Sequence, residues 1–139
     1  MSLAMSVEDR QKFLADMRVG IVSIARAGDR GPLTVPIWYD YEPGGPVRMI
    51  TDPDSLKGRV LKGVTRISLC AQSEALPYAY VSVEGPYRVR ELREGELESM
   101  AIRYLGEEMG RAYAADGGGN NIVVELETAN WLTVAYPSP

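Results

Sequence analysis

The sequence predicts a mainly β fold of the α+β class: a six-stranded antiparallel barrel with flanking helices, formed by one domain over residues 1–139. Segments rich in β-branched and aromatic residues alternate with short turns that contain Gly, Pro or Asp, and such short links favour antiparallel neighbours. Six strands of this length left flat would expose apolar faces and unpaired edges. We therefore expect the sheet to curl into a small barrel.

The elements are expected in the order helix, three strands, helix, two strands, helices, strand. Ser6 is the expected cap of the first helix, with Asp9 as its capping-box partner. Helices are also expected after residue 52 and within residues 93–115, broken near Gly106 or Gly110. The strands are expected at residues 19–27, 33–41, 47–51, 66–72, 78–92 and 122–136, the last with a bend near residues 129–130.

Composition narrows the classes of function. The net charge of −4 argues against nucleic acid as the main partner. No apolar run approaches the roughly 20 residues needed to cross a bilayer, and the N-terminus lacks a basic region followed by an apolar one. We therefore expect a cytoplasmic protein that does not bind membranes.

The chain has no histidine and a single cysteine, Cys70. This excludes Ser-His-Asp and Cys-His catalytic groups and removes the usual zinc and haem ligand sets, so no metal is expected. A magnesium site made of carboxylates alone stays open, but Asp52 and Asp54 are better explained as residues that face a helix dipole. If the protein is an enzyme, we expect a cofactor to carry the chemistry.

Residues 51–62 indicate a strand that runs directly into a helix with cations beside its first turn. Asp52 is the expected N-cap and Pro53 the first helical residue. The free backbone N–H groups of the following residues then point at whatever lies before the helix, as in a phosphate-binding site.

Lys57 is the candidate cation of this helix. Helical spacing places it on the apolar face formed by Leu56, Val60 and Leu61. Either its stem packs there while the ammonium reaches water, or an anionic ligand lies where the ammonium and the helix N-terminus converge.

The order of these motifs resembles a known superfamily. The strand that ends at Thr51, the helix with Ser55 and Lys57, the short strand from Arg66 and the aromatic-rich strand at residues 78–85 resemble the pyridoxamine 5′-phosphate oxidase-like split-barrel flavoproteins. Residues 102–106, Ile-Arg-Tyr-Leu-Gly, are similar to a helix motif of the branch that uses the deazaflavin coenzyme F420. The resemblance implies a homodimer of six-stranded split barrels, with a flavin or deazaflavin in a groove at the interface.

This chain contains only part of the residue pattern of the oxidases. Thr51, Ser55 and Lys57 match the phosphate-binding pattern of the oxidases, whereas Leu56 stands where they have an arginine. The strand at residues 35–40 lacks the arginine and lysine that bracket it in the oxidases.

Other parts of the pattern resemble the F420 branch. There, the backbone of the strand that contains Pro36, Ile37 and Trp38 is implied to contact the ring system. Helix geometry gives Arg59 and Lys62 a second cationic stripe, which either meets the acidic oligoglutamate tail of such a coenzyme or forms an ordinary solvated face.

Four aromatic residues are further candidates. Trp38 either stacks on the cofactor ring or substrate, or packs in the core or dimer interface. Tyr39, Tyr78 and Tyr80 either line a substrate cavity or supply a proton, or are buried at an interface.

Together these features favour an oxidoreductase that transfers hydride from F420 to a small unsaturated or electrophilic substrate. FMN is the alternative cofactor, and a non-catalytic flavin carrier is the alternative class. The sequence identifies neither the catalytic residue nor the natural substrate.

Overall fold

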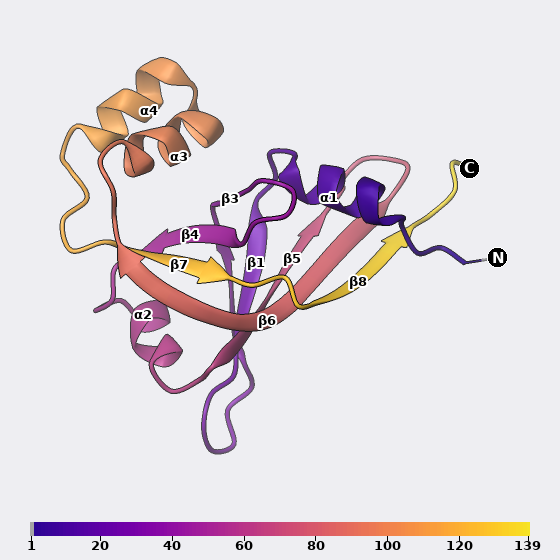
Figure 1. Cartoon of the computed structure of the whole chain (residues 1–139), viewed down its shortest axis with the longest axis horizontal. Helices are drawn as coiled ribbons and strands as arrows, with labels where there is room; N and C mark the ends of the chain where they lie inside the picture. The colour runs from indigo at the N-terminus through magenta and orange to yellow at the C-terminus, as the bar shows by residue number, and fades with distance from the viewer. Residues whose placement is uncertain (1) are drawn as a thin grey trace.

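The structure, a computed structural model, describes residues 2–139 and consists of one curled antiparallel sheet with helices around it (Figure 1). Hydrogen-bonded neighbours follow the order β2-β1-β5-β6-β7-β4-β3, and β8 pairs with β6. The strands are β1 (Gly20–Ile24), β2 (Leu33–Ile37), β3 (Tyr39–Tyr41), β4 (Val47–Thr51), β5 (Arg66–Gln72), β6 (Ala79–Glu91), β7 (Ile122–Leu126) and β8 (Asn130–Ala135).

The barrel closes at Trp38. β2 and β3 stand at opposite ends of the strand order, yet Trp38 alone separates them in the chain. The covalent chain therefore joins the two edges of the sheet at this residue. This architecture confirms the split barrel expected from the sequence.

The six predicted strands are confirmed, and two of them are divided. The strand expected at 33–41 breaks into β2 and β3, and the one expected at 122–136 bends between β7 and β8. The long strand β6 serves both halves of the barrel, because its first half pairs with β5 and β8 and its second half with β7. A Cβ atom at Gly85, in the middle of β6, would lie 2.1 Å from the carbonyl oxygen of Glu127, so only glycine allows the bend between β7 and β8 to approach this closely.

The apolar core lies inside the curled sheet. Alternate residues of β6, including Val81 and Val83, are fully buried, while Tyr80 and Ser82 face outward. Tyr39, Leu69 and Leu126 complete the same cluster from other strands, and Leu14 covers it from α1 (Val7–Ala15). The period of two in the sequence thus corresponds to one face in and one face out.

The first helix begins as predicted. The side chain of Ser6 accepts a hydrogen bond from the backbone N–H of Asp9 at 3.0 Å and caps α1. The third and fourth helices, α3 (Glu96–Leu105) and α4 (Glu107–Ala114), meet at Gly106, which has a positive φ of 84°. The predicted break at Gly106 is therefore confirmed.

The start of α2 (Leu56–Leu61) differs from the prediction. Ser55, not Asp52, is the N-cap, and Pro53 lies in the preceding turn, where the Asp52 carboxylate accepts the backbone N–H of Asp54 at 2.8 Å. The apolar-face assignment of Leu56 was also wrong, since this side chain is 52% exposed. The Asp52 carboxylate already accepts a hydrogen bond within the turn before the helix, so the Ser55 hydroxyl caps α2 in its place.

Figure 1 shows α2 and the α3–α4 hairpin at the same end of β4, while α1 lies across the other side of the barrel. At this end of the barrel four of the predicted site residues meet.

Candidate functional site

Four of the predicted site residues lie around one hollow. The hollow has a volume of about 250 Å³ and opens between α2, the end of β4 and the α3–α4 hairpin. Its walls include the predicted residues Trp38, Thr51, Ser55 and Lys57, together with Ile50, Asp52, Leu97, Met100, Tyr113 and Asn121. We call it the Trp38–Lys57 hollow.

Local geometry in α2 positions the polar side of this hollow. The Ser55 hydroxyl donates to the carbonyl of Asp52 at 2.6 Å and accepts the backbone N–H of Gly58 at 3.2 Å. The Thr51 hydroxyl, buried at the end of β4, lies 3.4 Å from the Ser55 hydroxyl. A Cβ at Gly58 would lie 2.4 Å from the Asp52 carbonyl oxygen, so glycine is required for α2 to fold back onto this turn. These contacts therefore hold the turn at residues 52–55 tightly against the start of α2.

Lys57 is the cation of the hollow. It is half-buried, and within residues 2–139 it forms no ion pair. Lys57 also borders a small apolar hollow that Ile37 and Leu61 line, so its side chain lies at both hollows. An ammonium without a carboxylate partner is available to an anionic ligand.

Aromatic side chains form the opposite wall. The Trp38 indole stacks on the ring of Tyr104, with centroids 5.0 Å apart and planes 4° from parallel. On the same indole, Tyr113 lies 5.6 Å away at an angle of 52°. Tyr113 comes from α4 and Tyr104 from α3, so both aromatic neighbours of Trp38 belong to the helical hairpin.

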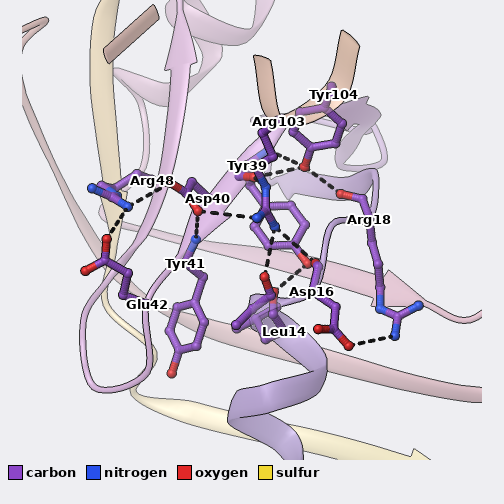
Figure 2. A network of polar contacts seen from close by, with 11 residues as sticks. Leu14, Asp16, Arg18, Tyr39, Asp40, Tyr41, Glu42, Arg48, Arg103 and Tyr104 are labelled. Carbon is purple, nitrogen blue, oxygen red and sulfur yellow. Dashed lines mark hydrogen bonds and ion pairs between the residues drawn. The ribbon is translucent and has the colours of Figure 1, made fainter. Parts of the chain in front are cut away.

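A polar network secures this wall to the barrel (Figure 2). The Tyr104 hydroxyl accepts the backbone N–H of Tyr39 at 3.0 Å and lies within hydrogen-bonding distance of the carbonyl oxygens of Arg18, at 2.6 Å, and Tyr39, at 2.8 Å. The Arg103 guanidinium donates to the carbonyls of Tyr39, Ala15 and Asp16 at 3.1–3.2 Å. These contacts join α3 to the end of α1 and to the first residue of β3.

Sequence reasoning identified Trp38 but missed Tyr104 and Tyr113. Arg103 and Tyr104 attracted notice only as part of a family motif, and helical spacing alone does not show which strand a helix residue will reach. The signal was nonetheless present, because Tyr104 and Tyr113 are aromatic residues on helices predicted to flank a barrel.

The structure places the other predicted cofactor residues apart from the Trp38–Lys57 hollow. Pro36 is exposed on β2, and Ile37 borders only the small apolar hollow next to Lys57. Arg59 is exposed on the other side of α2, where it borders a separate hollow with Arg26, and Lys62 is exposed at the end of the helix.

The predicted substrate-pocket tyrosines also lie elsewhere. Tyr39 is fully buried, and its hydroxyl donates to the carbonyl of Leu14 at 2.8 Å. Burial raises the pKa of Tyr39 strongly, so this hydroxyl stays protonated within the core. Tyr80 lies on the outer face of β6, and Tyr78, just before that strand, is 51% exposed.

Two further structural findings bear on the site. Within residues 2–139, no three or more His, Cys, Asp or Glu side chains are grouped so that they would hold a metal ion. Over the same residues, no helix combines the length and apolar character needed to span a bilayer.

No family model and no curated protein matches this sequence. Solved structures do match over most of the chain. A conserved hypothetical protein from Mycobacterium tuberculosis aligns with 96% of this chain and 86% of its own length, at a TM-score of 0.76 and 18% identity. An F420 reductase aligns with 88% of this chain and 94% of its own length, at a TM-score of 0.67 and 14% identity.

A protein from Listeria innocua that is named for pyridoxamine 5′-phosphate oxidase aligns with 91% of this chain and 96% of its own length, at a TM-score of 0.67 and 11% identity. At these identities the likeness concerns the fold. The chain therefore has the split-barrel fold that pyridoxamine 5′-phosphate oxidase-like and F420-dependent proteins share, as the motif order predicted.

Proposed function

We propose that this protein is a flavin- or deazaflavin-dependent oxidoreductase, with F420 as its cofactor and a small unsaturated or electrophilic substrate. One observation carries the proposal: the half-buried, unpaired Lys57 and the indole of Trp38 line the same hollow. A cation beside hydroxyl groups suits a phosphate, and a flat aromatic wall suits a ring system.

The residues present fit such a cofactor. Lys57 and Thr51 would hold its phosphate beside the turn that Ser55 fixes, and Trp38 would border its ring. When bound, F420 supplies a hydride to the substrate. The protein's own share is to orient the two reactants and to exclude water from between them, while solvent or a tyrosine provides the proton.

Asp52 disfavours a ligand with a high negative charge in the hollow, because its carboxylate would repel such a ligand. Its carboxylate also lines the wall, although one of its oxygens already accepts the backbone N–H of Asp54. The phosphodiester group of F420 carries a single negative charge, whereas the terminal phosphate of FMN carries more than one at neutral pH. This difference, together with Leu56 in place of the oxidase arginine, favours F420.

We propose that the site is completed by a second copy of the chain. Pockets for small molecules usually measure about 300–1,000 Å³, whereas the Trp38–Lys57 hollow measures about 250 Å³. One copy therefore offers a part of a flavin-sized site.

The outer face of the sheet is the surface we assign to this dimer. Ile21, Cys70, Ser82 and Leu132 stand in register on four neighbouring strands, and Ile21 and Leu132 are 39% and 61% exposed. Pro36 pairs with Ile21 and lies two residues before Trp38, so the row ends near the residue that lines the hollow. Exposed apolar residues such as Ile21 and Leu132 side by side on a sheet are typical of a surface that another chain covers.

A side-by-side titration of the purified protein with F420 and FMN tests the cofactor. We expect F420 to bind more tightly, followed by reduction of an electrophilic acceptor. Preference for FMN would favour the oxidase-like alternative, and tight binding without turnover of a panel of acceptors would favour a carrier. Binding of neither cofactor would contradict the proposal.

Light scattering tests the dimer. We expect twice the chain mass of 15.3 kDa, and a shift to the single mass when Leu132 is replaced by Glu. A monomer that still holds the cofactor tightly would contradict the shared site.

A further inference from the structure

Trp38 occupies an unusual position in the sheet. It is the single residue between β2 and β3, outside both strands, where the chain passes from one edge of the barrel to the other. The ladder hydrogen bonds that hold the neighbouring residues do not extend to it. Contacts of its side chain, and of the backbone next to it, therefore help to set its orientation.

Tyr104 contacts Trp38 through its ring and the next residue, Tyr39, through its hydroxyl. Its ring lies parallel to the indole of Trp38 at 5.0 Å, and its hydroxyl bonds the backbone N–H and approaches the carbonyl of the next residue, Tyr39. The same hydroxyl lies 2.6 Å from the carbonyl of Arg18, on the segment before β1. One side chain thus holds both the plane of the indole and the backbone that carries it.

α3 can serve as a fixed support for Tyr104 because both of its ends are anchored. At its start, the Glu96 carboxylate forms a bidentate pair with Arg90 of β6 at 2.7 and 2.8 Å. At its end, Arg103 donates to backbone carbonyls of α1 and β3. Gly110 brings α4 into close contact with Ile102, which leaves no space for a Cβ at Gly110.

We propose that Tyr104 is a positioning residue that acts through Trp38: it holds the indole against the wall of the Trp38–Lys57 hollow. Tyr104 is not among the side chains that line this hollow, so its effect on a ligand passes through the indole. The proposal rests on the proposed function for the identity of the ligand. Tyr104 stacks on the indole and Tyr113 lies tilted against it at 5.6 Å, so a ligand would contact the part of the indole that neither ring covers.

The test uses a Trp131→Phe background, in which Trp38 is the sole remaining tryptophan of the two in the chain. Two variants separate the ring from the hydroxyl: Tyr104→Leu removes both, and Tyr104→Phe removes the hydroxyl alone. Glu98→Gln is the matched control, since it changes a side chain of the same helix that is 50% exposed and takes no part in anchoring either end of α3. Acrylamide quenching of tryptophan fluorescence and near-UV circular dichroism report the indole directly, without any cofactor.

We expect Tyr104→Leu to raise the quenching constant of Trp38 at least about threefold and to remove its near-UV signal, with Tyr104→Phe between it and the parent. Glu98→Gln should leave both readouts unchanged. In titrations, Tyr104→Leu should weaken the preferred cofactor about tenfold, and Tyr104→Phe should weaken it less.

Equal quenching in Tyr104→Leu and the parent would overturn the positioning role, as would an equal rise in Glu98→Gln. If Tyr104→Leu does not fold, Tyr104→Phe decides the question: an unchanged quenching constant would overturn the proposal. Because the quenching arm needs no ligand, it is separate from the cofactor titration of the parent protein. Failure of that titration would overturn the oxidoreductase proposal while the result on the indole still stands.

Discussion

The cations beside α2 and α3 differ in how they are partnered. Arg90 of β6 pairs with Glu96 at the start of α3, and Arg103 lies near the end of α3. The two arginine side chains are only 17% and 19% exposed, and carboxylates and carbonyls surround both. On α2, Lys57 and Arg59 form no ion pairs within residues 2–139. The arginines at α3 hold structure together, and the cations at α2 are free to meet a ligand.

The physical reason is desolvation. A cation that loses water must regain its interactions from neighbouring groups, so partly buried arginines carry full sets of partners. The sheet beneath α3 adds to these partners, because Asp40, Arg48, Glu125 and Arg88 stand in register across four strands with alternating charge. A cation at the edge of a hollow has no such requirement until an anion enters. The following experiments test this contrast.

Arg103→Ala should have the largest effect. It leaves the carbonyls of Tyr39, Ala15 and Asp16 without their donor, and we expect a loss of about 3 kcal/mol in the free energy of unfolding. Denaturant unfolding measures it. Arg59→Ala is the matched control, with an expected change within about 0.5 kcal/mol. Equal losses in the two variants would remove the distinction between the helices.

Lys57→Ala should act on binding instead of folding. Loss of a charge-assisted contact should weaken the affinity for the cofactor by about 1.5–3 kcal/mol, with little change in unfolding free energy. Fluorescence titration gives the dissociation constant, and Lys62→Ala serves as the control on the same helix. An unchanged constant in Lys57→Ala would show that the phosphate lies elsewhere.

Glu96→Gln should change the acid stability of the fold. The hydrogen bonds from Arg90 lower the pKa of Glu96 from 4.5 to about 2. The carboxylate therefore stabilises the folded state fully above about pH 4.5, and this contribution is lost as the pH falls through about 2.

After allowance for solvent screening we expect Glu96→Gln to cost about 1–2 kcal/mol at neutral pH and to flatten the acid limb of the stability curve. Denaturant unfolding at several pH values measures both. Glu98→Gln is the control on the same helix, because the Glu98 side chain is 50% exposed and lies 3.9 Å from Arg111. A parallel acid limb in wild type and Glu96→Gln would contradict the assignment.

The smallest effect is expected for the replacement Arg59→Ala, on the affinity for F420. If the exposed cations on α2 meet an acidic tail, this variant should weaken F420 by about 0.5 kcal/mol at low salt and by less at high salt. A form of the coenzyme without its tail is the control, and it should bind both proteins equally. Equal loss for both forms would place Arg59 at another part of the ligand, and no loss for either would make it an ordinary solvated residue.

The course of the strands could be predicted well from the sequence because its causes are local. Alternation of apolar and polar residues located β4 and β5 at the expected bounds, and a Ser followed by Asp three residues later located the cap of α1. The error at α2 had a local cause too: Asp52 and Ser55 both precede the helix, and the preceding turn engaged Asp52 first.

The candidate site was only partly predictable. Residues 51–57 lie close in sequence, so Thr51, Ser55 and Lys57 were found together. Tyr39 was grouped with the pocket as a tyrosine that could line a cavity or supply a proton, but alternation along the chain turns it inward to the core. Tyr78 and Tyr80 share an outward face at the far end of β6 from α2, as the register of β5 with β6 shows.

The sequence by itself determined which segments are strands, that histidine takes no part in the chemistry, and that a lysine stands beside a helix start. Only the tertiary structure decided that Trp38 closes the barrel, that Tyr104 stacks on it, and that Arg103 holds structure while Lys57 borders a hollow. The two kinds of feature differ in how far apart in the sequence the interacting residues are. Strand patterns depend on adjacent residues, whereas the contact of Tyr104 with Tyr39 joins residues 65 positions apart and depends on how the whole sheet curls.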